Sequence, residues 1–330
     1  MSSPNAEAGW TTRAPAKVNL DLRMRGRRAD GYHLLSTVLQ SVALADVLAL
    51  RPSPGPFRLS CDMPGVPTDA RNLAWRGAAA MAGMLGIALD RWHLHIDKHV
   101  PSEAGLGGGS SDAVAAARLV AAAAGVEVPP ERLADVVRPL GADVAYFTWG
   151  GTMRGEGVGD ELSLLPDLEA AEVVIVRPPF GVSTRDAYGW YDERYDERPS
   201  SVGVRPSSVG LRPSSEVPRP SSVGLRPWPD GPRALSGDGG PFLWTDWRND
   251  LEAPVAARHP EIQAIVERLR DAGAQLAAMS GSGSACFGVF PPGGDITAVE
   301  TAWPEGTRVW RTRLLSRAEY ADATACVPDR

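Results

Sequence analysis

The sequence predicts an α+β fold in two lobes, and three observations carry this prediction. Helical and strand-like hydrophobic spacings occur in mixed order, without the regular strand–helix–strand repeat of a parallel sheet. Glycine and proline are concentrated in residues 199–241, where they fill 16 of 43 positions. The other residues, about 287 of them, are enough for two cores of ordinary domain size. We expect a flexible tail at 1–11, a first lobe at 12–165 and a second lobe at 166–330, interrupted by an insertion at 199–241.

The first lobe is predicted to start with a strand over residues 12–23, where Val18, Leu20 and Leu22 alternate on one face. Residues 32–50 mix helix-like and strand-like spacing and are compatible with either element. The other predicted elements are a helix over 72–89, a strand over 92–97, a helix from Asp112 to Ala124, a short helix over 131–139 and a hairpin over 152–165.

The second lobe is predicted around a buried strand over 173–176. A helix over 249–272, a strand–turn–strand over 275–290 and a strand around Val309 follow the insertion. The insertion itself repeats a seven-residue unit that starts with Pro-Ser-Ser, and a proline in every unit excludes a helix. We expect an extended or disordered loop there, with docking of a partner as the alternative.

Composition and charge exclude several classes of protein. The net charge is −6, and −8 outside the insertion, without a basic stripe, so nucleic acid is not an expected partner. No apolar run approaches the roughly 18 residues that span a membrane, and the first residues do not resemble a signal peptide. Three scattered cysteines do not make a disulfide framework. We therefore expect a cytoplasmic protein that does not bind membranes.

The most informative stretch is a glycine-rich loop that follows a predicted strand and leads into a helix. Four glycines within five positions turn the backbone tightly, so that successive N–H groups point to one place at a helix N-terminus. This pattern predicts a phosphate cradle, whereas the alternative is a flexible turn with a helix cap. No lysine follows the last glycine as in a Walker loop. The candidate residues are Pro101, Gly105, Leu106, Gly107, Gly108, Gly109, Ser110, Ser111 and Asp112, the last also a possible helix cap.

Residues 101–113 resemble the second motif of the GHMP kinases, a family of small-molecule kinases that enclose ATP phosphates with such a loop. Residues 14–22 are similar to the first motif of that family, and 279–287 to the third, a second glycine-rich turn. The resemblance implies an N-terminal ATP-binding lobe, a ferredoxin-like C-terminal lobe and an active site in the cleft between them. It implies ATP as cosubstrate, with Mg²⁺ carried on the nucleotide.

Further motifs narrow the resemblance within the family. Asp-Gly-Tyr-His at 30–33, Gly-Ala-Asp-Val at 141–144 and Glu-Gly-Val-Gly at 156–159 resemble the members that phosphorylate the 2-hydroxyl of 4-diphosphocytidyl-2-C-methyl-D-erythritol, in the non-mevalonate isoprenoid pathway. The implied partner is thus a small molecule that contains cytidine diphosphate. A kinase for homoserine or mevalonate is one alternative, and a non-catalytic nucleotide-binding protein is another. The protein itself is expected to be a monomer or a weak homodimer.

The resemblance implies roles for residues outside the glycine loop. Lys17 and Asp143 correspond to the catalytic pair, against the alternatives of a strand-edge lysine and a helix N-cap. Asn72 and Lys98 correspond to positions near the adenine, although Lys98 would also suit a solvated strand end. Residues assigned to the cytidine end are Asn19, Tyr32, His33 and, as an opposing aromatic wall, Tyr188, for which an ordinary core tyrosine is the alternative.

One cluster of histidines invites interpretation as a metal site. His93, His95 and Asp97 share one face of a predicted strand, and His99 lies nearby. The sequence shows no fourth ligand or second cluster, so we expect a solvated strand face and no metal-ligating residues.

Overall fold

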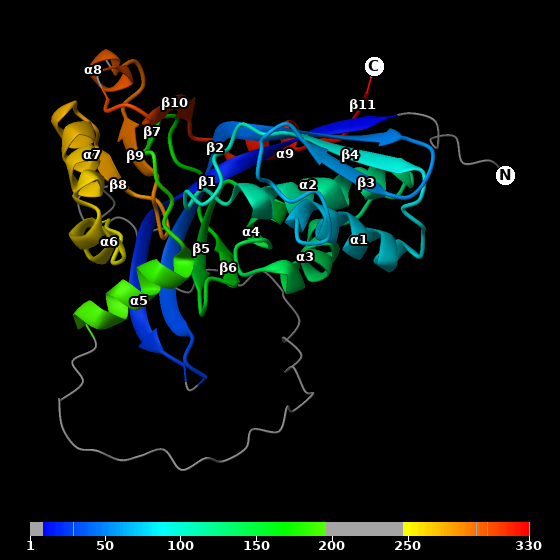
Figure 1. Cartoon of the computed structure of the whole chain (residues 1–330), viewed down its shortest axis with the longest axis horizontal. Helices are drawn as coiled ribbons and strands as arrows, with labels where there is room; N and C mark the ends of the chain where they lie inside the picture. The colour runs from blue at the N-terminus through cyan, green and yellow to red at the C-terminus, as the bar shows by residue number, and fades with distance from the viewer. Residues whose placement is uncertain (1–8, 29, 196–246, 295, 302, 330) are drawn as a thin grey trace, which may run out of the picture.

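The computed structural model describes residues 9–28, 30–195, 247–294, 296–301 and 303–329, which form two lobes (Figure 1). The insertion predicted at 199–241 and most of the predicted tail at 1–11 lie outside the described residues. Each lobe has its own sheet, and the two lobes pack against each other through strands near the start of the chain. The α+β, two-lobed fold predicted from the sequence is confirmed.

The sheet of the first lobe is built on two long antiparallel strands, β1 (Trp10–Arg27) and β2 (His33–Pro52). Within the described residues its strand order is β11–β1–β2–β4–β3, and β5 pairs with β2 beside this path and with β6. The other strands are β3 (Arg58–Cys61), β4 (Trp92–Asp97), β5 (Thr152–Glu156), β6 (Glu161–Leu164) and β11 (Val327–Pro328).

The ambiguous segment at residues 32–50 is thus one strand. Its apolar positions do not alternate because both faces are covered: Leu39 packs in the core of the first lobe, whereas Val38 and Val42 pack in a core shared with Phe287 of the second lobe. A strand buried on both faces has a continuous hydrophobic run instead of a period of two.

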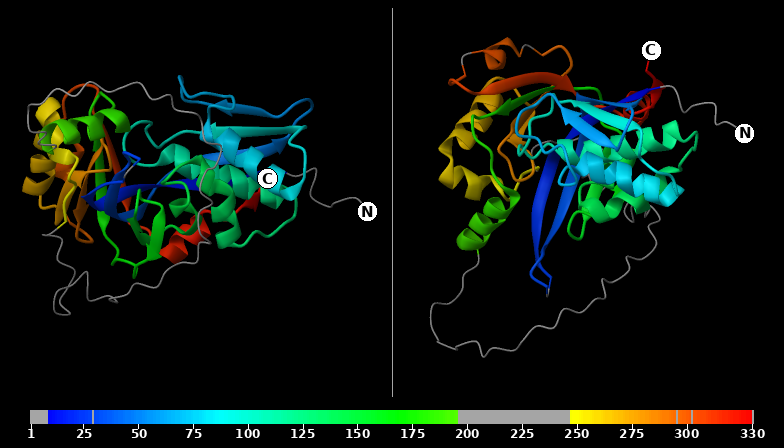
Figure 2. Two further views of the ribbon diagram at one scale, coloured as in Figure 1. Left: turned by 90° about the horizontal axis from the view of Figure 1, so that it is seen from below. Right: turned by 45° about the vertical axis from the view of Figure 1, so that its right-hand side comes forward.

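Helices cover one face of this sheet, as Figures 1 and 2 show. Helices α1 and α2 pack so closely that a Cβ on Gly77 would lie 2.1 Å from the carbonyl oxygen of Ala113. The predicted start of α2 at Asp112 is wrong by one turn, because the helix already begins at Gly108 with Gly107 as its left-handed N-cap (φ 70°). These helical elements are α1 (Leu73–Leu85), α2 (Gly108–Ala123), α3 (Pro130–Val137), a 3₁₀ turn (Arg138–Leu140) and α4 (Tyr146–Trp149).

The second lobe is an antiparallel sheet of order β10–β7–β9–β8. Numbered along the chain this order is 4-1-3-2, with helices after its first and third strands, which is the ferredoxin-like arrangement that was expected. Its strands are β7 (Glu172–Arg177), β8 (Leu276–Met279), β9 (Cys286–Phe290) and β10 (Arg308–Arg313). Its helices are α5 (Thr184–Tyr195), α6 (Glu252–Arg258), α7 (Pro260–Asp271) and α8 (Thr297–Glu300).

The single helix predicted over 249–272 is two helices. The break falls at His259, whose backbone leaves the helical region (φ −133°, ψ 82°) directly before Pro260. A residue before proline disfavours the helical conformation, and proline itself suits the first position of the next helix.

The end of the chain returns to the first lobe. After β10, helix α9 (Arg317–Ala323) packs beside α4, and β11 pairs with the start of β1. Tyr320 of α9 is buried and donates a hydrogen bond of 2.6 Å to the carbonyl oxygen of Phe147. The first lobe is therefore completed by residues from both ends of the sequence.

Candidate active site

A cavity of about 1180 Å³ contains nearly all of the residues that the sequence singled out. Its lining comes from the glycine loop, β1, the tip of the β1–β2 hairpin, α5 and the second glycine-rich turn at 281–283. Of the predicted site residues it contains Lys17, Asn19, Tyr32, His33, Asn72, Lys98, Pro101, Gly105, Leu106, Gly107, Gly108, Gly109, Ser110, Asp112, Asp143 and Tyr188. Ser111 is the exception, since it is buried and its hydroxyl donates to the carbonyl oxygen of Pro15 at 2.8 Å.

The glycine loop needs glycine for reasons of space as well as of backbone conformation. Gly105 and Gly107 have left-handed φ values of 74° and 70°. A Cβ on Gly105 would lie 2.0 Å from the carbonyl oxygen of Ser280, and one on Gly107 would lie 2.7 Å from the ring of Phe147. The loop leads directly into the N-terminus of α2, where the first N–H groups have no intrahelical acceptor. This geometry makes an anion cradle.

The second glycine-rich turn holds the cradle from the opposite lobe. Ser280 donates its hydroxyl to the carbonyl oxygen of Gly105 at 2.9 Å, and the N–H of Ala285 donates to Ala104 at 3.2 Å. The second and third motifs, about 175 residues apart in the chain, therefore form one structure. Gly281 and Gly283 of this turn both line the cavity.

Lys17 is a buried cation in the middle of β1. It is 2 % exposed, so the alternative of a strand-edge lysine is wrong. Its ammonium lies 3.6 Å from the Asp143 carboxylate and donates to the carbonyl oxygen of Gly105 at 2.7 Å and to Asn19 at 2.5 Å. Burial lowers the pKa of Lys17, and Asp143 partly offsets this effect. The positive charge is thus fixed beside the cradle.

Asp143 lies just before α4 without capping it. The N-cap of α4 is Ala145, and no side chain bonds the helix start, so the N-cap alternative is wrong. The Asp143 side chain is 45 % exposed, whereas that of Lys17 is 3 % exposed. The carboxylate therefore faces the cavity with its ammonium partner behind it. This arrangement can orient an incoming hydroxyl and accept its proton.

The far end of the cavity carries aromatic rings. Tyr32 is 66 % exposed at the hairpin tip, and the ring of Tyr188 on α5 lies 4.8 Å from that of His33. His33 Nε2 lies 2.7 Å from the carboxylate of Asp192, also on α5. Asn19 uses both ends of its amide within the protein, since it accepts from Lys17 and donates to Thr37 at 2.8 Å.

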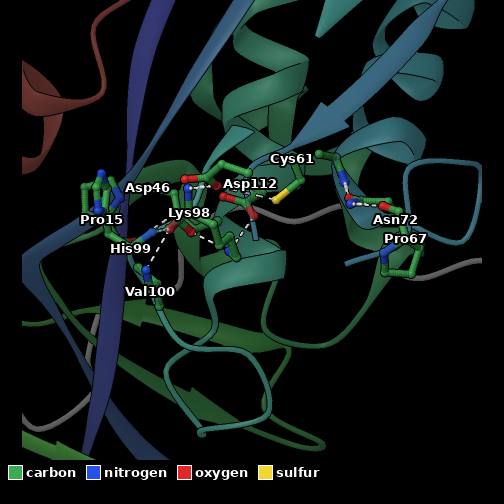
Figure 3. Close-up of polar contacts among 12 residues, drawn as sticks. Pro15, Asp46, Cys61, Pro67, Asn72, Lys98, His99, Val100 and Asp112 are labelled. Atoms are coloured by element: carbon green, nitrogen blue, oxygen red, sulfur yellow. Dashed lines mark hydrogen bonds and ion pairs between the residues drawn. The ribbon is translucent and has the colours of Figure 1, made fainter. Parts of the chain in front are cut away.

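Lys98 is buried in an ion-pair cluster that the sequence did not predict (Figure 3). Its ammonium lies 2.5 Å from Asp46 and 2.7 Å from Asp112, so the solvated strand-end alternative is wrong. Asp46 is fully buried and also accepts the N–H groups of His99 and Val100, each at 2.7 Å. Asp46 therefore ties the segment before the glycine loop to β2.

Asp112 does not cap α2, because it lies in the second turn of the helix and bonds Lys98 through one oxygen. Its other oxygen, Oδ1, is buried and has no hydrogen-bond partner among the described residues. Burial raises the pKa of Asp112 to about 8, Asp46 adds to the rise and Lys98 opposes it. Burial acts to lower the pKa of Lys98, but the carboxylates of Asp112 and Asp46 outweigh this effect and raise it.

Asn72 lines the cavity, but its amide also caps α1: Oδ1 accepts from the N–H of Ala74 at 2.8 Å and Nδ2 donates to Pro67 at 2.7 Å (Figure 3).

The histidines on β4 are held by a neighbouring strand. His93 and His95 both bond the hydroxyl of Ser60, at 2.7 and 2.8 Å. No group of three metal-ligating side chains occurs in the described ranges. No helix there is long and apolar enough to span a membrane.

Comparisons with known proteins agree with this geometry. The model of the GHMP kinases N terminal domain matches residues 72–151, and that of the GHMP kinases C terminal domain matches residues 242–307. A 4-diphosphocytidyl-2-C-methyl-D-erythritol kinase of Moorella thermoacetica is 39 % identical over 287 residues, which cover 86 % of this chain and 90 % of the relative. The enzyme of the same name from Solibacter usitatus is 36 % identical over 309 residues, covering 93 % and 89 %.

A solved structure of 4-(cytidine 5'-diphospho)-2C-methyl-D-erythritol kinase is similar, with a TM-score of 0.67 and 32 % identity, covering 92 % of this chain and 98 % of that one. The mevalonate kinase of Methanococcus jannaschii has a TM-score of 0.61 at 12 % identity, covering 93 % and 98 %, which shows the shared fold alone. The chain belongs to the GHMP kinase family of small-molecule kinases, and within it to the 4-diphosphocytidyl-2-C-methyl-D-erythritol kinases.

Proposed function

We propose that this protein transfers the γ-phosphoryl group of ATP to the 2-hydroxyl of 4-diphosphocytidyl-2-C-methyl-D-erythritol, a step of non-mevalonate isoprenoid synthesis. The observation that carries the proposal is the pairing of buried Lys17 with Asp143 beside a glycine cradle. A protein that only binds nucleotides needs the cradle and gains nothing from a desolvated ammonium, which is costly to bury. A phosphoryl-transfer enzyme needs both.

In this mechanism the residues orient the reacting groups and balance charge. Asp143 holds the acceptor hydroxyl and takes its proton as the phosphoryl group leaves ATP, while Lys17, 3.6 Å away, holds the carboxylate in place. The N–H groups at the start of α2 bind the phosphates, and Gly105 and Gly107 let the loop pack against Ser280 and Phe147 in the conformation that presents these groups. In this proposal Lys98 and Asn72 serve the nucleotide end of the cavity, and Tyr32, His33, Asn19 and Tyr188 serve the cytidine end.

Mg²⁺ supplies charge neutralisation on the transferred phosphoryl group when it is bound with ATP. Mg²⁺ keeps waters and phosphate oxygens as ligands and does not need an all-protein cage, which suits a metal that arrives on the nucleotide. The hydroxyl of Ser110 lines the cavity at the helix start and is available to that complex.

The test is ADP release with ATP and Mg²⁺ across three acceptors: 4-diphosphocytidyl-2-C-methyl-D-erythritol, homoserine and mevalonate. We expect turnover with the cytidyl substrate, identified by a phosphomonoester on its 2-hydroxyl. Turnover of homoserine or mevalonate alone would overturn the substrate assignment. ATP binding without turnover of any acceptor would favour a nucleotide-binding protein.

We also propose that the protein works in the cytoplasm as a monomer or weak homodimer. ATP and a cytidine diphosphate ester are charged metabolites that do not cross membranes unaided. The described chain supplies both the catalytic pair and the cradle from one copy, so the proposed chemistry does not need a second subunit. Light scattering on the purified protein measures the oligomeric state directly.

A further inference from the structure

Helix α5 lies against the distal half of the β1–β2 hairpin, at the cytidine end of the cavity (Figures 1 and 2). Asp192 on this helix makes the main polar contact between them. Its carboxylate forms an ion pair with Arg27 of β1 and a 2.7 Å contact with Nε2 of His33, the first residue of β2. Neither Asp192 nor Arg27 is in the lining of the cavity, whereas His33 is.

The charge of Asp192 decides which nitrogen of His33 carries a hydrogen. Burial acts to raise the pKa of Asp192, but Arg27 and His33 outweigh it and lower the pKa below its ordinary range. An ionised carboxylate only accepts hydrogen bonds. Nε2 of His33 therefore carries the hydrogen and donates it to Asp192.

A neutral imidazole has one N–H, so the other nitrogen, Nδ1, is left with a free lone pair. Within the described ranges Nδ1 of His33 has no hydrogen-bond partner. The ring stands 4.8 Å from Tyr188, at an interplanar angle of 45°, in the part of the cavity that the proposed function assigns to the cytidine. The ring thus offers a hydrogen-bond acceptor to that base.

Cytosine and uracil differ at the atom that such an acceptor would test. Cytosine carries an amino group at position 4, which donates, whereas uracil carries a carbonyl oxygen there, which accepts. If Nδ1 of His33 faces O4 of uracil, both atoms are acceptors and neither finds a hydrogen-bond donor. Sites that bond a substrate N–H reject an analogue that cannot donate it, because their own buried groups stay unpaired.

We propose that Asp192 is a positioning residue that holds His33 in the Nε2–H tautomer, and that this tautomer makes the cavity select a cytosine over a uracil nucleotide. The proposal rests on the proposed function and deepens it: Asp192 does not touch the substrate and acts through His33. Arg27 keeps the carboxylate ionised and oriented toward the ring.

Asp192→Asn should reverse the tautomer of His33, and asparagine is nearly the same size as aspartate. Arg27 binds the amide oxygen of the new side chain, so that its NH₂ group faces Nε2 of His33. Nε2 then has to accept, and the hydrogen moves to Nδ1, where it suits O4 of uracil. The experiment compares kcat/KM for the cytidine substrate with kcat/KM for its uridine analogue. We expect the wild-type preference for cytidine to fall by at least about tenfold, the size of one lost base contact.

Glu193→Gln is the matched control, because Glu193 is the next residue of α5, pairs with Arg258 and makes the same carboxylate-to-amide change away from His33. Its cytidine-to-uridine ratio should equal that of the wild type. A merely structural role of Asp192 would lower both rates of Asp192→Asn and leave their ratio unchanged, which would overturn the proposal. Wild-type protein that turns over neither substrate would instead overturn the proposed function.

A second measurement needs no variant. In ¹⁵N-labelled wild-type protein the His33 signals should show a protonated Nε2 and an unprotonated Nδ1 at neutral pH. The opposite assignment would refute the tautomer on which the selection depends, even if Asp192→Asn failed to fold.

Discussion

At the scale of single residues, removing Asp143 should distinguish nucleotide binding from phosphoryl transfer most clearly. Asp143 faces the cavity, and among the described residues it is Lys17, its ion-pair partner, that bonds the cradle at Gly105, so we expect the nucleotide site to persist when Asp143 is removed. We expect Asp143→Ala to lose at least about 2–3 orders of magnitude in kcat, the scale of a positioned proton acceptor. Calorimetry should show ATP affinity close to that of the wild type. Near-normal turnover in this variant would refute the mechanism.

The buried carboxyl of Asp112 gives a second prediction, about pH. Its pKa of about 8 lies far above that of an unfolded aspartate, near 3.9. The folded state therefore holds a proton that the unfolded state has lost, and its stability declines as pH rises from about 4 to about 8. The groups that face Asp112 are Lys98, Asp46 and, more weakly, Cys61.

Asp112→Asn removes this titration and keeps an acceptor for Lys98. We expect the free energy of unfolding of the variant, minus that of the wild type, to rise between pH 5.5 and 8 and to level off above pH 8. The rise is at most about 1.4 kcal/mol per pH unit. Urea denaturation at a series of pH values measures it. A constant difference across the range would show that Asp112 is ionised throughout.

The residues that could be predicted from the sequence are those in compact motifs. Gly105 and Gly107 belong to one short glycine-rich motif, and this motif alone predicts the cradle. Lys17 is recognisable because it is a charged residue within an otherwise apolar strand. Asp46 and Asp192 carry no such signal. Each acts on a partner far away in the chain, 52 residues for Asp46 and Lys98 and 159 for Asp192 and His33. Only the register of β2 and the docking of α5 bring them together.

At the scale of elements, the contact between α1 and α2 sets the position of the cradle. Gly77 allows the two helices to touch, because a Cβ there would lie 2.1 Å from the carbonyl oxygen of Ala113, one residue after Asp112. We expect Gly77→Ala to destabilise the protein by about 1–3 kcal/mol, as overpacking does, and to weaken ATP binding through the displaced α2. Thermal unfolding and calorimetry measure both effects.

Gly83→Ala is the matched control for this prediction. Gly83 lies in the same helix, and apart from its chain neighbours and the adjacent backbone of that helix no described atom lies within 4 Å of a Cβ placed there. Alanine at a compatible helical position stabilises by roughly 0.5–1 kcal/mol. If the two substitutions have the same effect, then close packing at Gly77 does not position α2.

The boundaries of helices and strands can be predicted where a local sequence signal such as a helix cap marks them. They cannot be predicted where tertiary packing determines where the element begins or ends. Helix α1 starts as expected after its Asn72 cap but ends at Leu85, before the predicted end at residue 89, because Gly86 takes the left-handed conformation; the hairpin of β5 and β6 is confirmed. The start of α2 was misplaced because Gly108 and Gly109 are poor helix formers, yet they lie in its first turn. The character of β2 was ambiguous because its burial comes from both lobes.

At the scale of the whole molecule, deleting part of the insertion at 199–241 tests whether the two lobes catalyse the reaction without it. Every residue with a proposed role lies outside it, and the bulky apolar side chains of its repeated Pro-Ser-Ser units are a few valines and leucines without aromatic rings. We expect deletion of 200–225 to leave turnover within a few-fold of the full chain in a steady-state assay. A collapse of activity would mean that the repeat closes the substrate site.

The return of the chain to its starting lobe has a consequence for synthesis. A ribosome makes the first lobe long before it makes α9 and β11, which cover Phe147 and the edge of β1. Until then the ring of Phe147, which supports Gly107 of the cradle, lacks its backbone anchor to Tyr320. The cradle thus lacks this support until α9 has been made, so we expect a growing chain that stops before α9 to bind ATP more weakly than the full chain.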